Sequence, residues 1–494
     1  MIRRYYATKD NTITNAFEEN LTTRGTGSNM GASDILETFS IYAQANTSSA
    51  ELARILIEFD TTKLSSDRAA GLIPASGSVS WCLKMYNAPH SQTTPSNFSL
   101  LVSAISASWQ EGYGIDMDSY SDLTNDQSGS NWIQARNSSS ADNGQWTTVG
   151  GDYHASPTFN QAFETGLEDL KIDVSDLVEQ WLKGSKANYG FGVRLADNFE
   201  TYFSSSTGAN TGSVLHNIAG QQRSFFRKKF FGRDSEFFFQ RPVLEARWDS
   251  SRRDDRGYFY ASSSLARPED NLNTLFLYNR IRGRLRDIPS VGTNAIRVSL
   301  YDSAGGTQLG TTFTGSHVST GIYMCNVTAS TTATSLVDVW HSGGVEFFTG
   351  SISVKSFNSN GYNPEDIYVL SMPNLRKEYR KKQTHRLNLY VREKNWSPNI
   401  HTQAVRSSIP SLVIPSASFQ LRRSIDDYIV VPYGTGSTTE QAHTALSFDV
   451  SGNYFDLDTT YLEAGYLYDV QYSFYDEENG WEEQPYRFKF RVVD

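Results

Sequence analysis

The chain has 494 residues and a formal net charge of −10. An acidic chain is a poor candidate for holding nucleic acid, because binding to phosphates depends on concentrated Lys and Arg. No apolar run approaches the roughly 20 residues that a membrane-spanning helix needs. Residues 1–10 carry Arg3, Arg4 and Lys9 without an apolar stretch behind them, which predicts no secretory signal. We therefore expect a protein made in the cytoplasm, with neither nucleic acid nor a membrane as its partner.

Aromatic side chains are abundant, with 27 Tyr, 28 Phe and 9 Trp beside 36 Gly. Aromatic residues favour the half-buried, pleated surface of a sheet, while Gly supplies tight turns. At roughly 100–200 residues per domain, the length suggests about three domains. The composition predicts an all-β protein built from sandwiches.

Alternation of apolar and polar residues with a period of two recurs along the chain. In VSWCLKMY, for example, Val79, Trp81, Leu83 and Met85 alternate with the residues between them. Short alternating segments separated by Gly, Ser and Asn clusters are typical of β-sandwiches. The predicted strands are 52–60, 79–86, 100–107, 189–195, 242–248, 296–301, 321–327, 345–354, 387–391, 466–475 and 486–493.

Only one segment shows clear helical periodicity. In residues 173–183 (DVSDLVEQWLK), the apolar side chains fall at positions i, i+3, i+4, i+7 and i+8, which form one stripe on a helix. Ser175 or Asp173 can cap its start, and Gly184 follows its end. We expect one short helix within a β domain.

Two charged segments suggest domain boundaries. Residues 249–257 (DSSRRDDRG) follow a predicted strand, and residues 376–386 (RKEYRKKQTHR) precede LNLYV. We therefore predict three tandem β-sandwich domains of the jelly-roll or Ig-like kind, covering 1–250, 251–375 and 376–494. The single helix falls in the first domain.

The two cysteines, Cys82 and Cys325, lie in different predicted domains and inside apolar strand-like runs. A chain of this size needs no disulfide staple, so we expect two buried free thiols. The eight His residues are scattered, without the His-Glu-x-x-His spacing of a zinc enzyme, and no Gly-x-Ser-x-Gly or phosphate-binding Gly-Lys-Ser/Thr loop occurs. We expect no enzymatic activity and no cofactor other than a candidate Ca²⁺.

The first 250 residues resemble the DNRLRE family of β-sandwich domains. The resemblance rests on the order of several motifs: DNTITNAFEEN, ARILIEFD, SWQEGYG, WTTVGGDY, KIDVSDLVEQWLKG, NYGFGVRL and GRDSEFFFQRPVLEARW. The closing motif departs from the family, because Asp234, Ser235 and Glu236 replace Ser-Arg-Glu. Two long insertions, 119–143 and 204–229, also go beyond the compact family.

This resemblance implies two settings for the chain. In secreted members the sandwich is a glycan-binding or spacer module, whereas proteins of this style in phage genomes belong to the virion. The last segment, 448–494, is similar to the closing hairpin of Ig-like modules in phage structural proteins. Because no secretory signal is predicted, we expect a virion structural protein of a tailed phage, in the head decoration, neck, tail or baseplate. Its expected partners are other virion proteins and further copies of itself.

The alternative is a carbohydrate-binding adhesin that recognises a glycan on the host surface. Trp109, Trp132 and Trp146 lie near polar loops, and an exposed indole suits the apolar face of a sugar ring. Burial of these side chains in a core is the commoner arrangement. Glycan stacking on Trp109 or Trp132 therefore remains the less favoured interpretation.

An acidic loop offers a candidate metal site. Asp116, Asp118 and Asp122 lie in a Ser-rich segment, and alternate carboxylates can surround Ca²⁺ with oxygen ligands. The glycine and terminal glutamate of an EF-hand loop are missing. A solvated insertion that uses Asp and Asn for turns is the alternative that we favour.

The segment 222–241 (QRSFFRKKFFGRDSEFFFQR) combines seven Phe residues with Arg and Lys. Adjacent aromatic pairs cannot all point inward on a strand with a period of two. One interpretation is a subunit contact, because aromatic residues and Arg are enriched at interfaces. Its predicted contact residues are Phe225, Phe226, Arg227, Lys228, Lys229, Phe230 and Phe231. Burial against the 204–229 insertion or the second domain is an equally favoured alternative.

Two further segments are candidates for contacts with other molecules. The basic run 376–386 can meet acidic subunits or nucleic acid, although a solvated linker is the commoner role for such a run. Residues 1–20 form the opening polar segment, and we expect them to contact neighbouring virion proteins.

Overall fold

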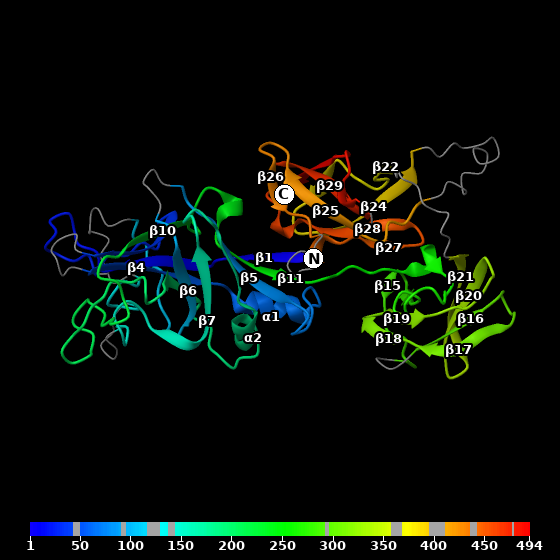
Figure 1. Ribbon diagram of the computed structural model, residues 1–494, viewed down its shortest axis with the longest axis horizontal. Helices are drawn as coiled ribbons and strands as arrows, with labels where there is room; N and C mark the ends of the chain where they lie inside the picture. The colour runs from blue at the N-terminus through cyan, green and yellow to red at the C-terminus, as the bar shows by residue number, and fades with distance from the viewer. Residues whose placement is uncertain are drawn as a thin grey trace. The chain divides into compact units, whose positions relative to one another are not determined.

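The computed structural model describes residues 1–42, 50–89, 95–115, 129–136, 144–291, 296–356, 368–394, 411–434, 442–476 and 479–494. The chain is a multi-domain β-sandwich protein, as predicted (Figure 1). It divides into two compact units, Ile2–Trp248 and Asp249–Asp494, the second together with Met1. The predicted boundary at 250 lies next to this division, while the further boundary at 375 stays a prediction.

The first unit contains a small and a large antiparallel sheet. The small sheet has the strand order β1 (Ile2–Tyr6), β11 (Val243–Arg247), β5 (Ser80–Met85) and β8 (Leu170–Asp173). The large sheet runs in the order β10 (Phe225–Phe231), β3 (Ile35–Tyr42), β4 (Ala50–Glu58), β9 (Phe191–Leu195), β6 (Phe98–Ile105) and β7 (Tyr153–Phe163), with β2 (Lys9–Thr14) paired to β4.

The strand β4 explains why the centre of this unit is apolar. Eight of its nine residues are buried, since it pairs with β3, β9 and β2 in the middle of the sheet. The terminal strands β1 and β2 are also built into the two sheets. Residues 2–14 therefore belong to the sandwich itself, while the contact role expected for residues 1–20 stays a prediction for the part beyond β2, where Glu19 and Asn20 are exposed.

Two helices occur among the described residues, one more than predicted. The helix α2 (Ser175–Leu182) confirms the predicted helix, with Val174 at its N-cap and Gly184 just beyond its end. The helix α1 (Thr61–Ala69) begins after Asp60, whose side chain accepts hydrogen bonds from the N–H groups of the first turn. Only Leu64 of α1 is a buried apolar residue, so the segment carries no apolar stripe that predicts a helix.

The unit Asp249–Asp494 contains two groups of sheets. The first group comprises β12 (Phe259–Tyr260), β21 (Val345–Lys355), β20 (Ser335–Ser342), β16 (Arg297–Tyr301) and β17 (Gln308–Thr314) in one sheet, β13 (Asn273–Tyr278), β19 (Ile322–Val327) and β18 (Ser316–Ser319) in another, and the ribbon β14 (Arg280–Ile281) with β15 (Arg284–Leu285). A core around Trp340 and Tyr323 fills the space between the two larger sheets.

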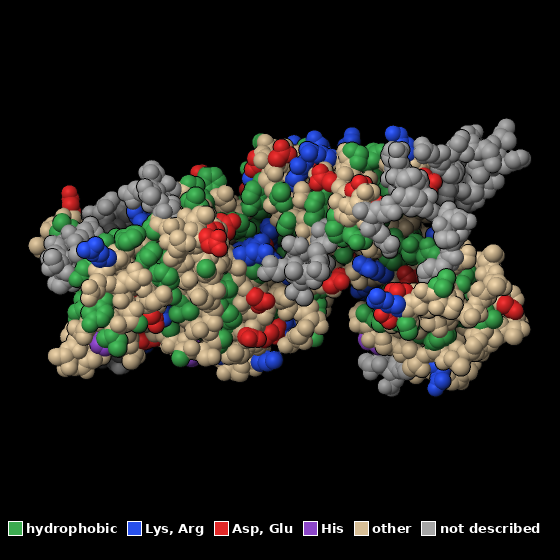
Figure 2. All heavy atoms as spheres, in the orientation of Figure 1, with side chains coloured by type: hydrophobic (Ala, Val, Ile, Leu, Met, Phe, Trp, Pro, Cys, Tyr) green, Lys and Arg blue, Asp and Glu red, His purple; other side chains and the backbone are tan. Residues whose placement is uncertain are grey.

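The second group follows from residue 368. One sheet has the order β22 (Tyr368–Ser371), β24 (Thr384–Glu393), β28 (Gly452–Asp458) and β27 (Ser447–Asp449). The other has the order β23 (Glu378–Arg380), β31 (Phe488–Val493), β29 (Leu467–Asp476), β25 (Ala417–Arg423) and β26 (Tyr428–Val431), with β30 (Gly480–Glu483) paired to β29. Every predicted strand overlaps an observed one. Figure 2 shows several Lys and Arg side chains (blue) along the upper rim of this group of sheets.

The two charged segments predicted as boundaries are parts of folded sandwiches. Arg256 is buried and donates hydrogen bonds to Asp338 and Asp254, so residues 249–257 do not form a solvated hinge. In the basic run 376–386, β23 pairs with β31, β24 begins at Thr384, and Tyr379 is buried. The expected solvated linker is therefore a strand, a turn and the start of a second strand.

The two thiols are free and buried, as predicted. Burial raises the pKa of Cys82 to about 11 and that of Cys325 to about 12. Within the described ranges, the chain has no helix that is long and apolar enough to cross a bilayer.

Candidate functional site

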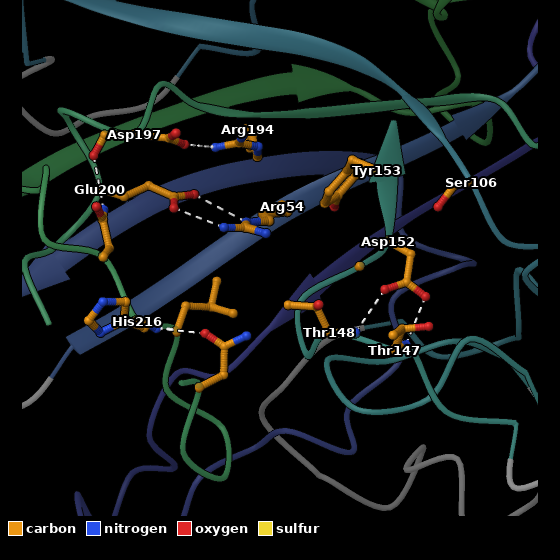
Figure 3. A pocket seen from close by; sticks show the side chains of 14 residues that line it. Arg54, Ser106, Thr147, Thr148, Asp152, Tyr153, Arg194, Asp197, Glu200 and His216 are labelled. Carbon is orange, nitrogen blue, oxygen red and sulfur yellow. Dashed lines mark hydrogen bonds and ion pairs between the residues drawn. The ribbon is translucent and has the colours of Figure 1, made fainter. Parts of the chain in front are cut away.

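A polar pocket of about 550 Å³ opens in the first unit, at one end of the large sheet (Figure 3). It is lined by residues of β4, β7 and β9, by the loop that precedes β7 and by the loop that follows β9. The lining residues are Arg54, Ser106, Thr147, Thr148, Gly151, Asp152, Tyr153, Arg194, Asp197, Glu200, Asn210, Leu215, His216 and Asn217. A cavity of this size accommodates a small organic ligand.

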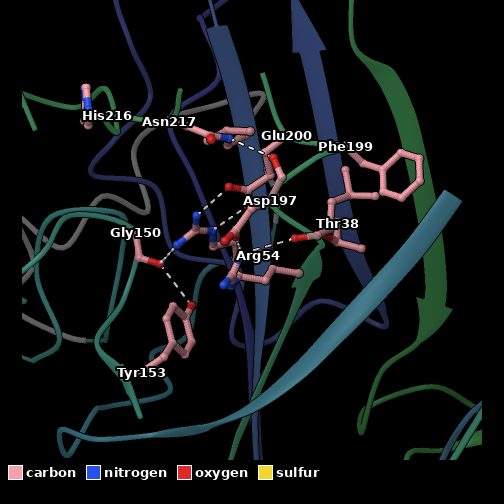
Figure 4. Close-up of polar contacts among 12 residues, drawn as sticks. Thr38, Arg54, Gly150, Tyr153, Asp197, Phe199, Glu200, His216 and Asn217 are labelled. Carbon is pink, nitrogen blue, oxygen red and sulfur yellow. Dashed lines mark hydrogen bonds and ion pairs between the residues drawn. The ribbon is translucent and has the colours of Figure 1, made fainter. Parts of the chain in front are cut away.

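The inner wall of this pocket is a buried ion pair. Arg54 on β4 donates from Nε and Nη2 to the two carboxylate oxygens of Glu200, at 3.1 and 2.8 Å, and from Nη1 to the carbonyl of Gly150 at 3.1 Å (Figure 4). Burial opposes the charged form of Arg54, but Glu200 and Tyr153 hold its pKa above the ordinary value. Arg54 is thus fully engaged, and it holds the loop that carries Glu200 against the sheet.

Tyr153 fixes the neighbouring wall. Its hydroxyl donates to the carbonyl of Gly150 at 3.0 Å, and burial raises its pKa. Gly150 and Gly151 adopt φ values of 85° and 102°, which side chains rarely tolerate. A Cβ on Gly151 would lie 2.4 Å from the Tyr153 hydroxyl, so the close approach of this turn depends on glycine.

One side of the pocket is formed by residues 210–217, which belong to the segment 204–229 that the sequence marks as an insertion. The Asn210 side chain accepts a hydrogen bond from the backbone N–H of His216 at 2.7 Å. Nδ1 of His216 accepts from the backbone N–H of Ser205 at 3.2 Å, so a neutral imidazole carries its proton on Nε2. The Asn217 amide donates to the carbonyl of Asp197 at 2.9 Å. These bonds give the loop a defined shape.

The charges around the pocket compensate one another in pairs. Arg194 forms an ion pair with Asp197. Asp152 accepts hydrogen bonds from the backbone N–H groups of Thr147 and Thr148, both at 2.8 Å. With the Arg54–Glu200 pair, the pocket has no uncompensated cation for a strongly anionic ligand.

A second hollow in the same unit is a groove of about 1000 Å³ over β2, β3 and β10. The side chains of Ile35, Glu37, Phe39 and Ile41 point into it from the outward face of β3. The groove is also lined by Thr12, Thr14, Ala16, Phe17, Glu18, Glu19, Leu21, Met30, Ser33, Glu51, Ile115, Arg227 and Lys229. Apolar side chains thus form much of its surface, and carboxylates outnumber cations.

Glu51 is the unusual member of this groove. Its side chain is buried, with the residue only 3% exposed, and Oε2 accepts from the backbone N–H of Phe17 at 3.0 Å. Its other oxygen, Oε1, has no hydrogen-bond partner among the described residues. Burial raises the pKa of Glu51, although Phe17 and the nearby Arg24 oppose this shift. A buried carboxylate oxygen without a donor is costly in a folded protein.

The predicted contact residues of the Phe-rich segment divide between the two faces of β10. Phe226, Lys228 and Phe230 point inward and are buried, and Phe231 is buried beside Phe237. Phe225 is 66% exposed. The prediction is therefore wrong for the four buried residues, since the sandwich itself covers them, and it is kept for Phe225, Arg227 and Lys229.

Lys228 illustrates why residues 225–231 were predicted as contact residues although most of them are buried. Its ammonium lies inside the sandwich and donates to the Asn87 side chain at 2.7 Å and to the carbonyls of Gly166 and Glu168 at 2.8 and 2.7 Å. Burial lowers its pKa to about 8. A lysine in a charged run is usually solvated, and nothing in the local sequence distinguishes this one.

The predicted glycan-stacking residues are also buried. Trp109, Trp132 and Trp146 all lie in one core cluster. Their indole N–H groups donate to the backbone carbonyls of Tyr189, Ser213 and Asn131 at 2.8 to 2.9 Å. None of the three presents an indole face to solvent, which corrects the assignment of Trp109 and Trp132 as stacking platforms.

The candidate calcium ligands Asp116, Asp118 and Asp122 lie outside the described residues. Within the described part of the chain, no group of three or more His, Cys, Asp or Glu side chains is arranged to hold a metal. The Ca²⁺ hypothesis for the acidic loop remains a prediction.

Neither the polar pocket around Arg54 nor the groove over β3 and β10 was predicted from the sequence. The pocket is assembled from positions such as 54, 106, 152, 194 and 216, which no local motif connects. A weak signal existed in the insertion 204–229, because a long loop added to a compact sandwich is often functional. The alternation of Ile35, Phe39 and Ile41 in β3 is a second signal, since it places an apolar stripe on one face of the strand.

No family model matches this chain, and no curated protein matches it either. Among solved structures, the Yersinia pseudotuberculosis adhesin InvE is similar at 14% identity, with a TM-score of 0.15 over 47% of this chain. The chain covers 56% of that adhesin, and thus little more than half its length. The Ig1-2 module of the Drosophila receptor protein tyrosine phosphatase DLAR is similar at 8% identity and a TM-score of 0.15, over 45% of this chain and 91% of the module. Such low TM-scores carry no argument about function.

Proposed function

We propose that this chain is a non-enzymatic structural protein of a tailed-phage particle, in the head decoration, neck, tail or baseplate, and that it works through protein–protein assembly. The resemblance of its first 250 residues to DNRLRE domains supports the setting. The groove over β3 and β10 supports the mode of action, and the orphan carboxylate oxygen of Glu51 within it carries the proposal.

The lining of the groove is complementary to a partner that has both apolar and basic side chains. Ile35, Phe39 and Ile41 offer an apolar surface whose burial stabilises a complex by about 25 cal/mol per Å² removed from water. A Lys or Arg that donates to Glu51 Oε1 would satisfy a buried acceptor that has no partner among the described residues. Charge-assisted hydrogen bonds of this kind are stronger than neutral ones.

A second copy of the chain supplies such a partner. Four carboxylates and two cations line the groove, which makes it acidic. The basic run 376–386 presents the exposed side chains of Arg376, Lys377, Arg380 and Lys382 on and beside β23, and is called the basic turn below. Because the acidic groove and the basic turn are different surfaces, their contact is heterologous and generates a ring or a filament. Both outcomes suit a repeated component of a particle.

Electron microscopy of particles tests the setting. A gold-labelled antibody against the chain is applied to particles released from cells that carry the gene. Label at one fixed position on the head, neck or tail supports the proposal. Particles without label, with the protein found only in the cell envelope or in soluble fractions, would refute the virion role.

Sedimentation velocity on the purified full chain tests the contact. We expect a concentration-dependent oligomer that Glu19→Lys weakens by introducing a cation into the groove. Glu51→Gln keeps the shape of the side chain but removes the charge that receives the partner's cation, so it should weaken the oligomer as well. Glu164→Lys is the matched control, because Glu164 is exposed and lies outside the groove.

A charge swap gives the decisive result. Lys377→Glu and Arg380→Glu on the turn should weaken the oligomer of the unaltered chain, and the Glu19→Lys chain should associate with that turn variant more tightly than with itself. A chain that stays monomeric at all concentrations, or an oligomer that neither set of variants changes, would refute the groove-to-turn contact.

A further inference from the structure

Lys228 is a buried amine that the assembly role does not use. We propose that its Nζ forms an isopeptide bond with the side-chain amide carbon of Asn87, with release of ammonia. The bond joins strand β10 of the large sheet to the segment that follows β5 of the small sheet, across 141 residues of sequence. The inference goes beyond the proposed function and stands without it, because neither residue lines the groove over β3 and β10.

The two reacting groups are already in contact. Nζ of Lys228 lies 2.7 Å from Oδ1 of Asn87. Because Oδ1 is bonded to Cγ at about 1.23 Å, Cγ lies within about 3.9 Å of Nζ. Reacting atoms held about 3–3.5 Å apart are in a near-attack position, which removes most of the entropic barrier to a reaction. A small rotation of the Asn87 amide therefore brings Cγ within reach of the amine.

The other partners of Nζ orient the amine. It donates to the carbonyls of Gly166 and Glu168 at 2.8 and 2.7 Å. A neutral amine has two protons and one lone pair, so with both protons on these carbonyls the lone pair points in the third direction, toward the Asn87 amide. Asp169 holds Asn87 in place, since its Oδ1 accepts from the backbone N–H of Asn87 at 2.7 Å. The loop between β7 and β8 thus positions both reactants.

The surroundings favour the neutral, nucleophilic form of the amine. The side chain of Lys228 is fully buried, and the ring centroids of Phe163 and Phe230 lie 5.1 and 5.2 Å from Nζ. Burial lowers the pKa of Lys228 to about 8, although the charges of Glu168 and Asp169 oppose this shift. A substantial fraction of the amine is therefore neutral in mildly alkaline solution, unlike that of a solvated lysine.

The reaction balances without a further reagent. The Nζ lone pair attacks Cγ of Asn87, and the Cγ–Nδ2 bond then breaks. One proton moves from Nζ to Nδ2, so the products are a secondary amide and ammonia. The carboxylates of Glu168 and Asp169, whose charges act on Lys228, are the bases available to carry this proton. Asn87 is only half-buried, which leaves the ammonia a path to solvent.

The bond fastens an edge of the first sandwich. β10 lies at the end of the strand order of the large sheet, where it pairs with β3. A covalent link to the segment after β5 keeps this strand attached when its hydrogen bonds open. Like a disulfide, the link restricts the unfolded chain, but it needs no oxidant, and both cysteines stay free.

Mass spectrometry of the denatured full chain tests the inference. After incubation in mildly alkaline buffer, we expect a mass below the sequence mass by about 17 Da, the mass of ammonia. Trypsin digestion should then give a branched peptide that joins Asn87 to Lys228, without cleavage after Lys228. A succinimide within an Asn-Gly pair has the same mass deficit but gives no branched peptide. A chain that keeps its full mass, or yields the two peptides only separately, would overturn the inference.

Two variants tie the mass loss to this pair of residues. Asn87→Ala removes the electrophilic carbon and leaves Lys228 its two backbone acceptors, so the chain should fold and give no branched peptide. Lys228→Met removes the amine and keeps a long apolar side chain in its place, and it should also give none. A branched peptide from Asn87 in the Lys228→Met chain, or from Lys228 in the Asn87→Ala chain, would contradict the assigned pair.

Two controls make matched changes outside the pair. Asn160→Ala makes the same substitution at an exposed position on β7, and Lys229→Met removes the adjacent lysine, which lies 3.8 Å from Glu37. Both chains should keep the mass deficit and the branched peptide, and loss of the branch in both would overturn the assignment. The Glu51→Gln chain should carry the bond as well, because the mass of the denatured chain does not depend on its oligomeric state.

Discussion

Arg54 and Glu200 form a two-bond ion pair across 146 residues of sequence, and both side chains are almost fully buried. The pair joins the central strand β4 to the loop that follows β9. Arg54 also reaches the Gly150 carbonyl, so a single guanidinium holds three separate segments together. The ion pair that forms the wall of the polar pocket therefore also holds segments of the first sandwich together.

Removing one partner of this pair should destabilise the first unit. Arg54→Met leaves Glu200 as an uncompensated buried charge, and such losses cost about 3–5 kcal/mol. Urea unfolding of the full chain, followed by tryptophan fluorescence, should show a lower midpoint for the transition of this unit. Replacing both residues, as Arg54→Met with Glu200→Leu, should cost less than the two single changes added together.

The control for this prediction is the neighbouring ion pair. Asp197 is largely exposed, and exposed pairs contribute about 0–1 kcal/mol, so Asp197→Asn should barely move the midpoint. An unchanged midpoint in Arg54→Met would mean that the buried pair contributes nothing net to stability.

Phe230 and Phe225 should respond very differently to truncation. Phe230 is fully buried, and Phe→Ala changes in a core cost about 3–5 kcal/mol. Phe225 lies on the same strand but is mostly exposed, so Phe225→Ala should change the free energy of unfolding by about 0.5 kcal/mol or less. Chemical denaturation of the two variants side by side measures the contrast. Similar stability in both would contradict the inward and outward assignment of β10.

Most of the strands that were predicted have a buried face, which imposes a period of two that is visible in single segments. Strands without a buried stripe, such as the mostly exposed β7, were missed. The helix α1 was not predictable, since it is held by the Asp60 cap and by one buried apolar residue, Leu64. The candidate sites were harder still. A tryptophan near polar loops looks the same in the sequence whether it faces solvent or, like Trp132, the core.

The same limit applies to charge. Lys228 and Arg256 stand in charged runs, yet each is buried and accepted by groups from distant parts of the chain, such as the Gly166 carbonyl and the Asp338 carboxylate. Only the fold reveals which charges are paired. The polar pocket could not be predicted for this reason, because its residues meet only after β4, β6, β7 and β9 have assembled.

Asp10 should make the stability of the first unit depend on pH. It is fully buried, Oδ2 accepts from the backbone N–H of Arg233 at 2.5 Å, and Oδ1 has no partner among the described residues. Burial raises its pKa from 3.8 to about 7. A raised pKa means that the folded state holds this proton more tightly than the unfolded state.

The sign of the effect follows from this difference. Below about pH 4 the carboxyl is protonated in both states, and its contribution to stability is fully present. As the pH rises from the unfolded pKa to the folded pKa, the contribution is lost, by an amount on the order of 4 kcal/mol for the shift from 3.8 to about 7. Asp10→Asn should therefore flatten the decline in urea midpoint between about pH 4 and pH 7. A variant with the same pH profile as the unaltered chain would exclude Asp10 as the cause.

Cys82 and Cys325 should resist thiol reagents in the folded chain. The thiolate is the nucleophile, and burial raises the pKa of Cys82 to about 11 and that of Cys325 to about 12, so almost no thiolate forms near neutral pH. Both side chains are also shielded from solvent inside β5 and β19. We expect a chromogenic thiol reagent at about pH 8 to react with both residues after unfolding in urea, and only very slowly with either residue in the native protein.

The rate of this slow native reaction reports local opening of each sandwich, because reaction requires exposure of the strand that carries the thiol. Cys82→Ser and Cys325→Ser assign the two rates to their units, and rapid stoichiometric reaction of the native chain would contradict the burial of either thiol.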